Sequence, residues 1–113
     1  MTGFIALMGG SEFCTACVQM DRALFGLVEP HARVAILPTA AARENPGKVV
    51  DNGRRYLRKL GIGAEGLLIT TREQADNPEL VGRLDFYQAV YITGGDPLHL
   101  LETLRGSLLW SAL

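Results

Sequence analysis

The sequence contains few cysteines and no long apolar segment. Two cysteines, Cys14 and Cys17, occur in 113 residues, which excludes a disulfide scaffold and favours a reducing compartment. No apolar run comes near the roughly 20 residues that a membrane-spanning helix requires. Residues 1–8 carry no basic segment, and their apolar run is too short for a signal peptide. We therefore expect a cytoplasmic protein with no membrane partner.

An excess of charge of either sign is also lacking. The chain has 11 Lys and Arg against 12 Asp and Glu, which leaves a net charge of −1. A nucleic-acid-binding domain of this size is usually strongly basic, so we expect no nucleic-acid partner. The apolar fraction of 48% is typical of a globular chain and excludes a disordered tail. No linker or repeat interrupts residues 1–113, which are predicted to form a single α/β domain.

Motifs for cofactors, metals and nucleophiles are missing as well. The first apolar run is followed by neither a Gly-x-Gly-x-x-Gly pattern nor a P-loop lysine. A second Cys-x-x-Cys pair, which a zinc site would need, is absent. We therefore expect no cofactor and no metal ion. The sequence also has no Gly-x-Ser-x-Gly nucleophile elbow.

The chain does contain four short, uninterrupted apolar runs, at 4–8, 33–38, 66–70 and 89–93. Runs that do not alternate with polar residues indicate strands buried on both faces, as in a parallel sheet. Helical patterns lie between and after these runs, at 14–28, 46–60, 77–85 and from Asp96-Pro97 onward. The alternation predicts a doubly wound, mostly parallel, flavodoxin-like sheet. In the first helix the expected apolar stripe consists of Cys17, Met20, Leu24, Leu27 and Val28.

The C-terminal segment is apolar and shows no obvious helix-capping signal. It contains Leu108, Leu109, Trp110, Ala112 and Leu113. One interpretation is a terminal helix docked on the sheet. The interpretation that we favour is a fold whose second half is missing, so that the domain is incomplete after about four strands.

Ligands of open α/β sheets bind outside the carboxyl ends of the strands. The segments expected there are 9–12 (Gly9, Gly10, Ser11 and Glu12), 39–42, 70–73 and 93–96 (Thr93, Gly94, Gly95 and Asp96). A Gly-Gly pair lets a ligand approach backbone N–H groups, which can hold a phosphate, a carboxylate or a developing oxyanion. The simpler explanation is that these glycines only shape tight turns.

Some polar residues near these turns have both a structural and a functional explanation. Asp96 fits an N-cap of the helix that it precedes, and Glu12 fits a solvated loop charge. The functional explanation for both is that they bind a cationic group or orient a base. His99, in the first turn of that helix, either approaches the site or packs against it. His31 fits a surface loop.

The Cys14-x-x-Cys17 pair lies at a predicted helix start. A helix N-terminus lowers a thiol pKa, so a redox function is one interpretation. The other is that both are small core residues, since Cys17 lies on the apolar stripe.

Three segments resemble the N-terminal half of the cyanophycinase and aspartyl dipeptidase family of serine peptidases, which has a class I glutamine amidotransferase-like fold. They are Met-Gly-Gly-Ser-Glu-Phe at 8–13, Arg-Val-Ala-Ile-Leu-Pro-Thr-Ala at 33–40 and Val-Tyr-Ile-Thr-Gly-Gly-Asp-Pro at 90–97. The resemblance implies a hydrolase of acidic or modified dipeptide-like bonds. It also implies that Gly94 and Gly95 help to build an oxyanion hole, with Gly9, Gly10 and Ser11 beside it.

The same resemblance implies that the nucleophilic serine and the catalytic histidine lie on later strands, which this chain does not contain. We therefore expect the chain to be inactive by itself and, if completed, to act on a small peptide-like substrate. The alternative functions are a small flavodoxin-like anion-binding or regulatory module and the thiol redox protein. An exposed sheet edge would also favour a homo-oligomer.

Overall fold

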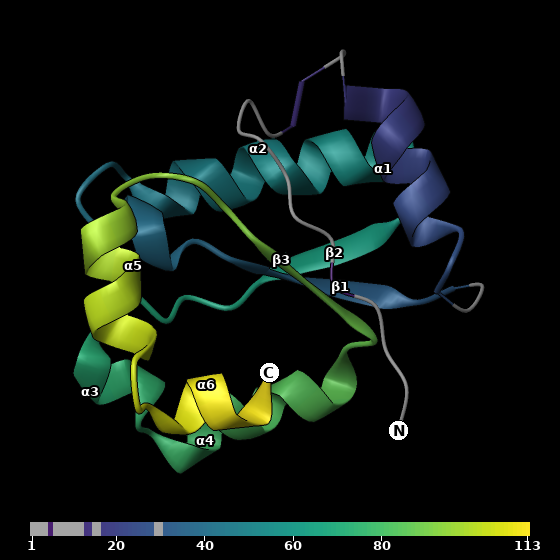
Figure 1. Cartoon of the computed structure of the whole chain (residues 1–113). Helices are drawn as coiled ribbons and strands as arrows, with labels where there is room; N and C mark the ends of the chain where they lie inside the picture. Colours follow the sequence, from purple (N-terminus) through teal and green to yellow (C-terminus); the bar gives the residue numbers. More distant parts are fainter. Residues whose placement is uncertain (1–4, 6–12, 15–16, 29–30) are drawn as a thin grey trace.

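The computed structural model describes residues 5, 13–14, 17–28 and 31–113. Within them lies a three-stranded parallel sheet of β1 (Arg33–Leu37), β2 (Gly63–Gly66) and β3 (Ala89–Ile92), in the order β2-β1-β3 (Figure 1). The strand expected at 4–8 and the turn expected at 9–12 lie outside the described residues, apart from residue 5. The prediction of a parallel α/β sheet is confirmed.

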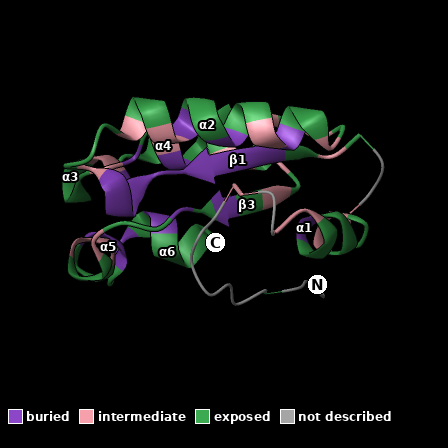
Figure 2. Cartoon of the chain, turned by 90° about the horizontal axis from the view of Figure 1, so that it is seen from above, coloured by how far each residue is buried: buried purple, intermediate pink, exposed green. Residues whose placement is uncertain are grey.

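Helices cover both faces of this sheet, as a doubly wound fold requires. Successive residues of β1 point to opposite faces, and Figure 2 shows this strand buried between α2 on one side and α5 and α6 on the other. Val34 and Ile36 pack with the core residues of α2 (Pro46–Lys59), whereas Ala35 and Leu37 pack with Leu109 and its neighbours. The second face is covered by α3 (Arg72–Ala75), α4 (Pro78–Gly82), α5 (Pro97–Leu104) and α6 (Leu108–Ala112).

Short 3-10 turns complete the described elements, at η2 (Thr39–Ala41) and η3 (Arg83–Phe86). Among the described residues, no helix has the length and apolarity that crossing a membrane would take.

The strand predicted at 66–70 is displaced in the structure, because β2 ends at Gly66. Residues Leu67 and Ile69 are buried, and Leu67 still donates its N–H to the carbonyl of Ile36 at 2.8 Å. The apolar run therefore marks residues that are buried after the strand has ended. It does not mark the residues that pair with β1. The paired segment, Gly63–Gly66, contains no large apolar residue. At its end α2 lies very close, because a Cβ at Gly66 would be 2.5 Å from a methyl carbon of Val50.

The first helix is shorter and turned differently from the prediction. The structure places α1 at Val18–Phe25 rather than 14–28. Asp21 is fully buried, whereas Met20 and Leu27 of the expected stripe are 42% and 55% exposed. The hydroxyl of Tyr56, on α2, donates to Asp21 at 2.5 Å. The apolar spacing predicted that Met20, rather than Asp21, would be buried. The hydrogen bond from Tyr56 stabilises the carboxylate of Asp21 in this buried position.

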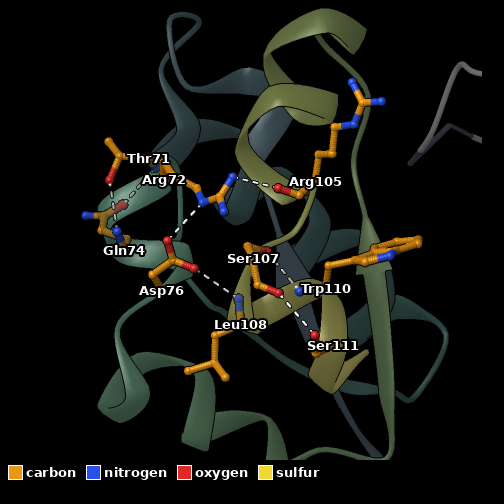
Figure 3. A network of polar contacts seen from close by, with 9 residues as sticks. All are labelled: Thr71, Arg72, Gln74, Asp76, Arg105, Ser107, Leu108, Trp110 and Ser111. Carbon is orange, nitrogen blue, oxygen red and sulfur yellow. Dashed lines mark hydrogen bonds and ion pairs between the residues drawn. The ribbon is translucent and has the colours of Figure 1, made fainter.

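The C-terminal segment forms a docked helix, and its capping residue is Ser107, which the sequence analysis missed. The side chain of Ser107 accepts from Trp110 N–H at 3.0 Å, and Leu109 is fully buried. Figure 3 shows how Asp76 joins this helix to α3: it accepts from Leu108 N–H at 3.0 Å and from Arg72 at 2.9 Å. The Arg72 hydrogen bond and then the Leu108 N–H lower the pKa of Asp76. The apolar end of the chain is therefore partly explained by packing on the sheet layer.

Candidate functional site

Three of the four strand-end segments predicted to gather do meet at the carboxyl edge of the sheet. The turn after β1 lies in the middle and contacts both neighbours. Thr39, which is fully buried, donates its hydroxyl to the carbonyl of Ile69 at 2.6 Å. On the other side Asp96 donates its N–H to the carbonyl of Ala40 at 2.7 Å. The loops after β2 and β3 are thus tied to the same short 3-10 turn.

Gly95 determines how closely the loop after β3 can approach this turn. Its φ is +146°, a conformation that side chains disfavour. A Cβ at this position would lie 2.3 Å from the carbonyl oxygen of Ala40 and 2.9 Å from the nitrogen of Ala41. Both atoms are backbone and cannot swing away. A glycine is therefore required here, and the simpler explanation of a tight turn accounts for at least part of the Gly94-Gly95 pair.

Asp96 is the N-cap of α5, as predicted. One carboxylate oxygen accepts from Leu98 N–H at 3.0 Å and from His99 N–H at 3.3 Å. The other oxygen lies 3.9 Å from a guanidinium nitrogen of Arg43, whose side chain is 80% exposed. The carboxylate thus occupies the amide donors that an anion at this helix N-terminus would need. Arg43 was not singled out in the sequence, because nothing in its local pattern shows that it lies beside Asp96.

His99 ties α5 to the end of the segment after β2. Its Nε2 lies 2.7 Å from the carbonyl of Thr70. A carbonyl can only accept, so Nε2 carries the proton in this contact. Thr103, one helical turn later, places its hydroxyl 3.4 Å from the same nitrogen. His99 therefore does approach the edge of the sheet, where it is half-buried and joins α5 to the segment after β2.

The remaining predicted site residues cannot be placed by the structure. Gly9, Gly10, Ser11 and Glu12 lie outside the described residues. His31 is exposed with a positive φ of 65°, as a loop position allows. Within the described part of the chain, no three side chains of His, Cys, Asp or Glu gather as a group that could hold a metal ion.

The comparison with curated proteins finds no match. A crystal structure of a peptidase from an acI-B1 Actinobacterium is similar to this chain, with 30% sequence identity and a TM-score of 0.77. The similarity covers 92% of this chain and 45% of the peptidase, so the chain spans less than half the length of that relative. The model of Peptidase family S51 matches residues 5–113. This match extends over nearly the whole chain and includes all three strands and the Gly94-Gly95 turn, and we conclude that the chain belongs to peptidase family S51.

Proposed function

We propose that this chain forms one wall of the active site of a serine-type peptidase, and that the Gly94-Gly95 turn supplies backbone donors for the oxyanion. Membership of a peptidase family supports a peptidase-like hydrolase. The observation that carries the finer assignment is the approach of Gly95 to Ala40, because it fixes backbone amides at the carboxyl edge of the sheet. Preorganised amides stabilise a developing oxyanion because they need not reorient during the reaction.

The hydrogen bonds of this turn narrow the choice of donor. The N–H of Asp96 already donates to the carbonyl of Ala40. At the start of α5, the N–H groups of Leu98 and His99 donate to the carboxylate of Asp96. Gly94 and Gly95 precede this cap and are exposed, and the approach to Ala40 fixes the position of Gly95. The cap also argues against an anion-binding module that uses the N–H groups of this helix, because the N–H groups of Leu98 and His99 already donate to Asp96.

The described serines support the proposal that the nucleophile is not among these 113 residues. Ser107 is buried and caps α6, and Ser111 donates its hydroxyl to the carbonyl of Ser107 at 3.3 Å. Neither lies on an elbow between a strand and a helix. An oxyanion hole without a nucleophile retains only weak catalysis. We therefore propose that the chain by itself does not turn over substrate.

The substrate class that we propose is a small peptide-like molecule with an acidic group. Arg43 supports it, because its exposed guanidinium stands beside Asp96 at the sheet edge and could pair with a substrate carboxylate. The cytoplasm is the compartment that we propose, because the chain has only two cysteines, which fits a reducing compartment.

The test starts from the coding sequence that follows the codon for Leu113. If a strand and a Gly-x-Ser-x-Gly elbow follow, the extended chain is expected to hydrolyse dipeptides with an acidic residue and to react with a serine-directed fluorophosphonate. The 113-residue chain should do neither. Hydrolysis or labelling by the 113-residue chain would contradict the missing nucleophile. An extended chain that hydrolyses dipeptides without any reactive serine would contradict the serine mechanism.

A further inference from the structure

Two cysteines and a buried carboxylate lie together at the start of α1, away from the strand-end turns. The sulfurs of Cys14 and Cys17 are 3.3 Å apart. Cys17 N–H donates to the carbonyl of Cys14 at 3.0 Å, which is the bond between residues i+3 and i that is typical of a turn. Such a turn brings the two Cα atoms within about 7 Å, which is the range that a disulfide bridges. Both side chains are half-buried, so a small reagent can reach them.

Asp21 lies one helical turn after Cys17, on the same side of α1. It is fully buried, and one of its oxygens accepts from the Tyr56 hydroxyl at 2.5 Å. Its other oxygen, Oδ1, is buried with no hydrogen-bond donor among the described residues. A buried carboxylate oxygen without a donor is costly, and such groups are found at sites with a redox or catalytic role.

The surroundings of Cys17 change the pKa of its thiol. A hydrogen bond to Cys14 and then burial raise the pKa of the Cys17 thiol, and the charge of Asp21 raises it further. The structure thus contradicts the expectation of a helix-lowered pKa for Cys17, which has no side-chain bond to the amides of α1. A positioned base would therefore help Cys17 to lose its proton when it reacts.

We propose that Cys14 and Cys17 form a reversible disulfide by exchange with a low-molecular-weight disulfide, and that Asp21 is the proton acceptor for Cys17. In the first step the Cys14 thiolate attacks the external disulfide, forms a mixed disulfide and releases one thiolate. In the second step the Cys17 proton passes to Asp21, and the Cys17 sulfur attacks the sulfur of Cys14. The Cys14–Cys17 bond forms, and the second external thiolate leaves. Two protein thiols are oxidised and one external disulfide is reduced to two thiols.

The first experiment uses the full 113-residue chain equilibrated with reduced and oxidised glutathione, then trapped with a maleimide and weighed by mass spectrometry. The expected product is lighter by two hydrogen atoms and takes up no maleimide, whereas the reduced chain takes up two equivalents. Cys14→Ser and Cys17→Ser, which cannot form the bond, should stop at a mixed disulfide with glutathione. Mixed disulfides at both positions of the wild type, or two thiols that stay open to maleimide, would overturn the proposal.

The second experiment tests the role of Asp21 by following the mixed disulfide over time. Asp21→Asn should slow its conversion to the internal disulfide by roughly tenfold or more, because a positioned base is lost. Tyr56→Phe is the control, since it removes the hydrogen bond from Tyr56 to Asp21 but keeps the carboxylate, and it should not slow this step. Equal slowing in both variants would show that Asp21 acts only through packing. The first experiment needs no Asp21 variant, so the disulfide is tested even where Asp21→Asn does not fold.

Discussion

Replacing Gly95 by alanine tests the packing on which the candidate site rests. The added Cβ would lie 2.3 Å from the carbonyl oxygen of Ala40 and 2.5 Å from its carbon. It would also sit on a residue with a φ of +146°. Backbone strain of this kind costs about 1–3 kcal/mol, and forcing an extra carbon into a packed site costs about 1–3 kcal/mol more. We therefore expect Gly95→Ala to lower the free energy of unfolding by roughly 2–6 kcal/mol.

Three other glycines separate the two contributions. Gly61 has a φ of +79° with no heavy atom within 4 Å of an added Cβ, so Gly61→Ala measures strain alone, about 1–2 kcal/mol. Gly66→Ala measures only crowding against the side chain of Val50, and it should lower the free energy of unfolding by about 1–3 kcal/mol. Gly82 has neither problem, and Gly82→Ala should stabilise the chain by about 0.4–1 kcal/mol.

The assay is urea unfolding of the four variants, combined with amide hydrogen exchange at Asp96. In the wild type this amide donates to Ala40 at 2.7 Å, and Gly95→Ala should remove its protection because the loop must move outward. The reasoning is refuted if Gly95→Ala is no less stable than Gly82→Ala and Asp96 stays protected.

Three further predictions concern α6, its ion pair and the exposed apolar surface. Leu109→Ala should cost about 2–5 kcal/mol in thermal or urea unfolding, because Leu109 is fully buried; Leu108→Ala, at a 42% exposed position, is the control and should cost far less. The folded pKa of Asp76 is lowered from its ordinary value of 3.8, so its contribution is present above that pH and lost as the pH falls through the folded pKa; a stability difference between wild type and Asp76→Asn that does not shrink below that pH would contradict this. The isolated chain should self-associate through apolar side chains such as Trp110, 58% exposed, and light scattering that shows a monomer at high concentration would contradict this.

The sequence predicts the sheet well because parallel strands leave a strong signal. The run at 33–38 is buried on both faces and appears as β1 with only the last residue outside it. The segment at 66–70 shows the limit of the same signal. Leu67 and Ile69 are buried after the strand ends. The paired segment Gly63–Gly66 contains no large apolar residue, and α2 leaves no room for a side chain at Gly66. An apolar run predicts that residues are buried. Which residues pair with a neighbouring strand depends on the path of that strand, and no local sequence pattern predicts this path.

The candidate site is predicted in outline for a similar reason. The strand-end turns could be located because parallel strands end at one edge of a sheet. The hydrogen bonds that tether these turns could not be predicted. They run from Thr39 to Ile69 and from His99 to Thr70, and each joins residues far apart in the sequence. The buried position of Asp21 was missed because it depends on Tyr56, 35 residues later.

The tethers bear on how the candidate donors would act in a complete peptidase. The bonds from Thr39 to Ile69, from Asp96 to Ala40 and from His99 to Thr70 all join residues of this chain. Hydrogen bonds within this chain therefore hold the Gly94-Gly95 turn against its neighbours. An oxyanion hole contributes most when its donors are fixed before the charge develops. In the function that we propose, this part of the fold carries the rigid part of the site, and the nucleophile lies outside these 113 residues.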